Sequence, residues 1–143
     1  ALLIDSDEIS QLVGAPERVD AAVQEGFRMT VPSPVMLRVA TRPSRIGSVG
    51  INAGDRVILS NYMANRKVGD FNPEREIPKE LRQLWFGAGP HFCIGMPLAT
   101  RQTHAYTDML MRVHSERRLV IRGRKTRKRT LAAGYSKLEI RCL

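Results

Sequence analysis

Apolar positions near the start of the chain recur at the spacing of a short helix. Ile9 and Leu12 fall on one face of this helix, and Gly14 is a suitable residue to end it. Asp5 and Glu8 stand at the spacing of a capping box, in which each side chain bonds a free backbone N–H of the first turn. The pattern predicts a helix that is capped at Asp5 or the next residue.

Two longer stretches predict two further helices. Pro16 suits the first turn of one of them, and Pro32 and Pro34 end it by forcing an extended path. Its shared face consists of Val19, Ala22, Val23, Phe27 and Thr30. The other helix runs from about Gly95 to Ser115, with a predicted buried stripe of Met96, Ala99, Thr103, Tyr106, Leu110 and Val113.

The middle of the chain has the pattern of short strands. Residues 35–40, 45–49 and 56–59 are apolar and partly β-branched, and a turn signal at 52–55 separates the last two. These features predict a small antiparallel sheet. Residues 61–85 show no clean period and predict an irregular, packed meander.

The tail after the long helix predicts two more short strands, at 119–121 and 137–140. No internal repeat and no compositional break divides the chain. The whole pattern therefore predicts one segment over residues 1–143 with an α+β fold that is mainly α.

Composition narrows the classes of protein that remain. With 143 residues, the chain is long enough for one core, and 43% hydrophobic residues exclude disorder throughout. Two cysteines exclude a disulfide-scaffolded secreted domain and a four-cysteine zinc site. No stretch has the length of a membrane span or the apolar core of a signal peptide, so we expect a cytoplasmic protein.

The net charge of +9 is concentrated in residues 117–129, which hold eight Lys and Arg and no acid. A solvated hairpin or helix exit is the favoured interpretation of such a run. A docking face for an acidic protein and a nucleic-acid patch are the alternatives. Because the run contains no aromatic residue that could stack on bases, we do not expect nucleic acid as a partner.

A glycine-rich loop at residues 86–95 holds the candidate chemistry. Cys93 lies just before the long helix, where backbone N–H groups and the helix dipole favour a thiolate. The loop lacks the Lys and Ser/Thr of a phosphate-binding loop. A Cys93–His91 nucleophile pair has no evident orienting group, and the chain offers too few well-spaced ligands for zinc. A redox thiol and a structural turn around a buried cysteine also remain open.

The decapeptide resembles the cysteine-ligand loop of cytochrome P-450, the haem-thiolate monooxygenases. Members of the family carry Phe, Gly, a basic residue, Cys and Gly in order, with two residues between the first two and one residue between each later pair. The residues that fill these positions here are Phe86, Gly89, His91, Cys93 and Gly95. Gly87 also matches bacterial members.

Further residues match the family in order along the chain. Glu25 and Arg28 resemble its Glu-x-x-Arg pair, and Arg75 resembles the meander arginine that completes this structural triad. Arg38 resembles the strand arginine that reaches a haem propionate, as His91 does. Glu76 stands where the family usually has an aromatic residue.

The resemblance implies haem b as cofactor, with Cys93 as the iron ligand. Arg38, Phe86, Gly87, His91 and Gly95 are then the other cofactor-binding residues, and no residue of this chain is implied to be catalytic. It also implies monooxygenation of an organic small molecule, with electrons from a ferredoxin or flavoprotein.

The matched motifs correspond to the C-terminal portion of the family, so we expect an N-terminal portion with the distal helix to be needed for activity. The alternatives are a catalytically dead remnant and one half of a split enzyme, either of them acting as a haem-binding or interaction module.

Overall fold

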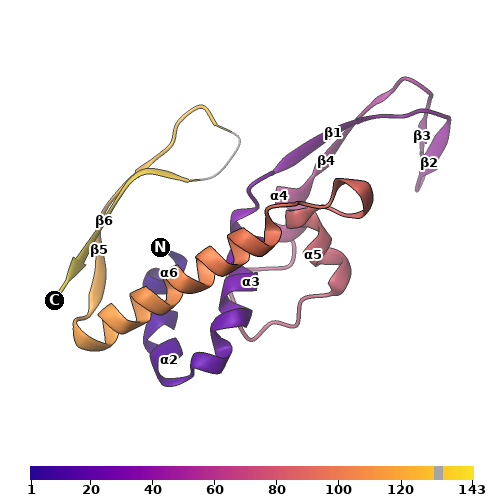
Figure 1. The fold of residues 1–143 in the computed structure, drawn as a ribbon. Helices are drawn as coiled ribbons and strands as arrows, with labels where there is room; N and C mark the ends of the chain where they lie inside the picture. The colour runs from indigo at the N-terminus through magenta and orange to yellow at the C-terminus, as the bar shows by residue number, and fades with distance from the viewer. Residues whose placement is uncertain (131–133) are drawn as a thin grey trace.

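The long helix α6 (Met96–Glu116) is the axis against which the N-terminal helices pack (Figure 1). The computed structural model describes residues 1–130 and 134–143. It places α1 (Leu2–Asp5), α2 (Glu8–Gly14) and α3 (Val19–Thr30) before the sheets, with a 3-10 turn at Pro16–Arg18. The main buried core combines residues of these helices with Leu119 after α6, and it consists of Ile9, Leu12, Val19, Ala22, Val23, Met111 and Leu119.

The predicted capping box at the start of α2 is wrong. The N-cap position falls on Asp7, with a left-handed φ of 58°, and its side chain makes no capping bond to the backbone. The carboxylate of Asp7 instead accepts a 2.9 Å hydrogen bond from the hydroxyl of Ser10. Asp5 is the last residue of a separate helical turn, α1, and is therefore not placed to cap α2.

Two strands form a ribbon, and the chain between them forms a small hairpin. β1 (Val35–Val39) pairs antiparallel with β4 (Arg56–Ser60), with Leu37 opposite Ile58. β2 (Ser44–Ile46) pairs with β3 (Val49–Ile51). The predicted continuous strand at 45–49 is therefore wrong, because Gly47 adopts a φ of 58° and turns the chain back.

Residues 61–85 are more regular than their pattern predicts. They contain α4 (Asn61–Arg66) and most of α5 (Lys79–Phe86), with the irregular segment limited to residues between these helices. The hydroxyl of Ser60 caps α4 by accepting from Met63 N–H at 3.4 Å. The buried residues of α4 are two asparagines, so a count of apolar positions could not reveal it.

The chain ends in a hairpin of β5 (Leu119–Thr126) and β6 (Tyr135–Cys142), which extends both predicted tail strands. In α6 the fully buried positions are Thr107 and Met111, and five of the six residues of the predicted stripe are half-buried. The stripe is wrong only at Tyr106, which is 62% exposed. The expected α+β fold with mainly helical content is confirmed. None of the helices in the described part of the chain is long and apolar enough to cross a membrane.

Candidate functional site around Cys93

The loop before α6 is closed by backbone hydrogen bonds that fix the position of Cys93. The N–H of Cys93 donates to Phe86 O at 2.7 Å, and Met96 N–H donates to Cys93 O at 3.2 Å. A 3-10 turn at Gly89–His91 lies between Phe86 and Cys93. Cys93 is a free and exposed thiol, so the structural interpretation as a buried cysteine is wrong.

Gly87 is required by the shape of this loop. Its φ is 77°, and a Cβ built there would meet His91 O at 2.9 Å. A side chain is therefore excluded both by the left-handed backbone and by the returning chain. Gly95 is less restricted, since a Cβ there would lie 3.8 Å from the sulfur of Cys93, which is ordinary contact.

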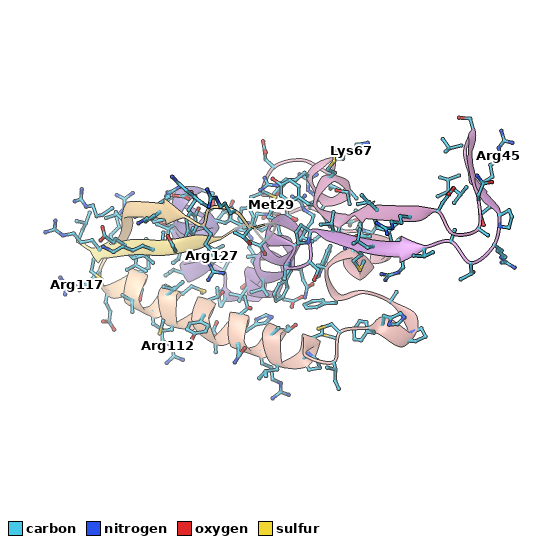
Figure 2. The ribbon with its side chains drawn as sticks, turned by 90° about the horizontal axis from the view of Figure 1, so that it is seen from above. Met29, Arg45, Lys67, Arg112, Arg117 and Arg127 are labelled. Carbon is cyan, nitrogen blue, oxygen red and sulfur yellow. The ribbon has the colours of Figure 1, made fainter. Side chains whose placement is uncertain are left out.

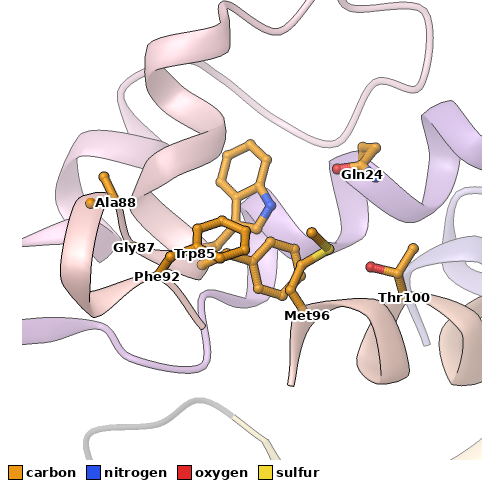
Figure 3. Close-up of a pocket in the computed structure, with 9 residues that line it drawn as sticks. Gln24, Trp85, Gly87, Ala88, Phe92, Met96 and Thr100 are labelled. Atoms are coloured by element: carbon orange, nitrogen blue, oxygen red, sulfur yellow. The ribbon is translucent and has the colours of Figure 1, made fainter. Parts of the chain in front are cut away.

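Phe86 anchors the start of the loop against α3. Its ring meets Phe27 edge to face, with the centroids 5.0 Å apart. A cavity of about 390 Å³ lies beside this contact (Figure 3). Its lining consists of Gln24, Trp85, Phe86, Gly87, Ala88, Gly89, Phe92, Met96 and Thr100. Cys93 does not line it, so this cavity lies beside the loop rather than at the sulfur.

The two basic residues expected at the cofactor lie on different elements. His91 is exposed in the 3-10 turn of the loop, and Arg38 is exposed on β1. The guanidinium of Arg38 donates to Leu37 O at 2.8 Å. Among the described residues, no hydrogen bond or ion pair joins Arg38 to the Cys93 loop.

Glu25 and Arg28 form a buried ion pair behind the loop, on α3. Arg28 Nε donates to Glu25 Oε2 at 2.7 Å, and Arg28 Nη2 donates to Glu25 Oε1 at 2.6 Å. A charge buried this deeply is tolerated because it is paired and hydrogen-bonded. The pair therefore forms a polar centre that can hold other segments by their backbone groups.

The segment between α4 and α5 is attached to this pair. Arg28 also donates to Gly69 O at 2.9 Å and Asp70 O at 3.1 Å, and Glu25 accepts from Asn72 N–H at 2.9 Å. Arg75 lies 3.7 Å from Glu25, measured from Nε to Oε1. All three residues proposed for the structural triad are thus brought together.

Asn65 also belongs to this polar centre, although no role was predicted for it from the sequence. Its backbone carbonyl accepts from Arg28, and its side chain donates to Asn61 O at 2.8 Å. Asn61 in turn donates to Ser33 O at 3.1 Å, just before β1. Two asparagines four residues apart are the signal that could have identified them, since such residues share a helix face.

The arrangement around Cys93 provides one soft ligand with an open approach. Ile94, next to the thiol, is 99% exposed, and Leu98 is 62% exposed on the first turns of α6. The described residues contain no cluster of three or more His, Cys, Asp or Glu that could hold a metal ion by itself. This donor set fits an apolar cofactor that brings most of the ligands of its own metal and carries acidic groups for Arg38 and His91.

Comparison with known proteins shows the family to which the chain belongs. The family model described as Cytochrome P450 matches residues 17–115. A Bacillus subtilis protein named as a cytochrome P450, YjiB, is 37% identical over 106 residues, which are 70% of this chain and 26% of that protein. The 6-deoxyerythronolide B hydroxylase of Saccharopolyspora erythraea is 35% identical over 101 residues, covering 68% of this chain and 25% of the hydroxylase.

Solved structures show the same fold. Cytochrome P450-153 from Novosphingobium aromaticivorans superposes with a TM-score of 0.83 at 27% identity, covering 99% of this chain and 37% of that one. The mycinamicin VIII C21 methyl hydroxylase of Micromonospora griseorubida also gives 0.83, at 25% identity, with coverages of 97% and 37%. The chain thus spans about a quarter of the curated relatives named above.

Proposed function

Because the chain belongs to the cytochrome P450 family, we propose that it forms the C-terminal haem-binding portion of a monooxygenase with Cys93 as the iron ligand. The observation that carries this proposal is the free, exposed thiol of Cys93 at the start of α6, held by the hydrogen bond from its N–H to Phe86 O. The substrate is proposed to be an organic small molecule, and the reaction inserts one oxygen atom from O₂.

Haem b, when bound, supplies the oxygen chemistry, and the residues of this chain bind and orient it. Phe86 fixes the loop against α3 by its contact with Phe27. Gly87 allows the loop to fold back, and Gly95 leaves room beside the sulfur. Arg38 and His91 are proposed to bind the propionates.

A second, N-terminal portion is part of the proposal. Ile94 and Leu98 are exposed next to Cys93, which supports the view that another segment completes the cofactor site. A split enzyme would supply that segment as a separate chain. A remnant without it would bind haem weakly and act only as an interaction module.

The electron donor of the complete enzyme is proposed to be a ferredoxin or a flavoprotein. The cytoplasm is the proposed compartment, because Cys93 and Cys142 are both free thiols and disulfides are rare there. Neither proposal depends on the identity of the organic substrate.

A spectrum of the reduced, CO-bound protein tests the assignment of Cys93. The chain is mixed with haem and with the N-terminal portion of a relative such as cytochrome P450-153, and the thiolate-type red-shifted Soret band is recorded. We expect Cys93→Ala to abolish this band and Cys142→Ala, the matched control, to retain it. Loss of the band in Cys142→Ala with retention in Cys93→Ala would overturn the proposal.

A further inference from the structure

The cavity beside the Cys93 loop is large enough to hold a small molecule of its own. Its volume is about 390 Å³, and ligand pockets in proteins measure roughly 300–1,000 Å³. Of the residues proposed to bind the cofactor, Phe86 and Gly87 line it, whereas Cys93, His91 and Arg38 do not. The cavity is therefore available to a ligand other than the proposed cofactor.

The walls of this cavity are mostly apolar. Trp85, Phe86 and Phe92 supply three aromatic rings, and Met96 supplies a thioether. None of the nine described residues that line the cavity carries a charge. Arg117, the first residue of the basic run, lies at the opposite end of α6 from this loop (Figure 2). Such walls favour a neutral, planar aromatic molecule over an ion.

Two polar atoms of the lining residues have no hydrogen-bond partner in the described part of the chain. They are the indole Nε1 of Trp85 and the hydroxyl Oγ1 of Thr100, and both atoms are shut off from solvent. Trp85 as a whole is only 5% exposed. A buried polar group without a partner costs free energy, because it has lost its hydration without gaining a hydrogen bond. A bound molecule that pairs these atoms would remove that cost.

The side chain of Met96 separates the two unpartnered groups. In Figure 3 its sulfur lies between the indole of Trp85 and the hydroxyl of Thr100, and all three residues line the same cavity. Methionine has three rotatable side-chain bonds and adapts its packing readily. A ligand in the cavity can therefore displace Met96 and reach both groups.

The two unpartnered groups specify an oxygen acceptor on the ligand. An indole N–H can only donate, a threonine hydroxyl can donate as well as accept, and one carbonyl oxygen has lone pairs for both donors. Water is a poor substitute for such a ligand. The volume corresponds to about ten water molecules, whereas Gln24, Trp85 and Thr100 are the only described lining residues with nitrogen or oxygen in their side chains.

We propose that the cavity beside the Cys93 loop binds a neutral, planar aromatic molecule that carries a carbonyl oxygen. The rings of Trp85, Phe86 and Phe92 hold its apolar part, and Trp85 and Thr100 donate hydrogen bonds to its oxygen. This site does not depend on the proposed role of Cys93, because Cys93 does not line the cavity.

Calorimetric titration of the 143-residue chain with 1-indanone tests the proposal. 1-Indanone is a neutral bicyclic aromatic ketone, and indane, which has the same rings without the oxygen, is the matched control ligand. Trp85 is the sole tryptophan of the chain, so its fluorescence emission shows whether binding occurs beside it. The calorimetric titrations are repeated after haem is added, and again after the N-terminal portion of cytochrome P450-153 is added.

Three variants separate the polar groups of the cavity from the rest of α6. Trp85→Phe removes the indole N–H and keeps an aromatic ring, and Thr100→Val removes the hydroxyl with little change of shape. Thr103→Val is the matched control, since Thr103 lies about one turn further along α6, does not line the cavity and donates to Ala99 O at 2.8 Å. Circular dichroism checks that each variant folds as the parent chain does.

We expect the parent chain to bind 1-indanone about tenfold more tightly than indane, because the ketone oxygen pairs two buried donors. Trp85→Phe and Thr100→Val should each weaken the binding of 1-indanone by about three- to tenfold, and Thr103→Val by less than about twofold. The emission of Trp85 should shift when 1-indanone binds to the parent chain.

Equal affinity for 1-indanone and indane would overturn the proposal, and this comparison needs only the parent chain. An unchanged emission of Trp85 on binding, or an equal loss of affinity in Thr103→Val, would overturn it as well. Loss of binding when haem is added would assign the cavity to the cofactor, and loss when the N-terminal portion is added would assign it to that interface. Both results would overturn this proposal without affecting the assignment of Cys93, which the CO-bound spectrum tests separately.

Discussion

Arg28 holds Glu25 by two hydrogen bonds in a site that excludes solvent, with exposed side-chain fractions of 0% and 1%. The same guanidinium reaches the carbonyls of Gly69 and Asp70, which belong to the segment after α4. One ion pair on α3 therefore fixes a segment more than forty residues away in sequence, which lacks regular secondary structure of its own.

The first prediction is that Glu25→Gln destabilises the protein. The substitution removes one charge and leaves Arg28 buried without its partner, which typically costs about 3–5 kcal/mol. We expect a lower yield of haem-competent protein, measured by thermal melting and haem content, rather than a selective change in turnover.

Glu17→Gln is the control for this prediction, because Glu17 is exposed in the 3-10 turn before α3. Its free energy of unfolding should lie within about 0.5 kcal/mol of that of the parent chain. If Glu25→Gln melted like the parent with full haem occupancy, the pair would have no structural role.

Sequence patterns predicted the elements whose burial follows a clear period. In α3, Val19, Ala22 and Val23 of the predicted face are buried, whereas Thr30 at its end is exposed. The two tail strands were predicted from their apolar runs, but the structure makes both of them longer. The Cys93 loop was identified by its resemblance to the cysteine-ligand loop of the family, and the structure adds the reason for Gly87, whose Cβ would meet the returning chain.

Features that depend on tertiary contacts were not predictable from local pattern. α4 buries Asn61 and Asn65 rather than apolar residues, because their amides satisfy backbone carbonyls. In α6 the stripe was wrong at Tyr106, which is left outside, whereas Thr107 and Met111 are buried where α2 and α3 pack against the helix. Neighbouring elements determine which residues of a helix are buried, and the periodicity along that helix alone does not show where those elements pack.

The second prediction is that Gly87→Ala disturbs the loop that positions Cys93. A Cβ would lie 2.9 Å from His91 O at a residue with a φ of 77°, so the chain between them has to shift. We expect a destabilisation of about 1–3 kcal/mol together with reduced haem retention, measured by melting and by the Soret band.

Gly47→Ala separates the effect of the positive φ from that of the steric contact. Gly47 has a similar φ of 58°, but nothing lies within 4 Å of the added Cβ. It should lose some stability through its backbone and keep its haem. Equal haem loss in both variants would indicate general unfolding rather than a displaced loop.

The third prediction concerns the apolar face of α6 that the described residues leave uncovered. At 100° per residue, Leu98 and Met109 share the face of α6 opposite Thr107, and they are exposed whereas Thr107 is buried. Apolar residues grouped in this way usually mark an interface. We therefore expect the chain alone to bind the dye ANS and to self-associate in size-exclusion chromatography.

A matching N-terminal portion should reverse these properties. We expect its addition to lower ANS binding, to raise haem affinity and to restore oxygenation when an electron donor is supplied, because it covers the open side of Cys93 and the exposed face of α6. Replacing Leu98 and Met109 by Gln should weaken this association while leaving the buried core of α6 at Thr107 and Met111 intact. A compact monomer of the chain alone, with one haem bound and coupled turnover, would show that no further portion is needed.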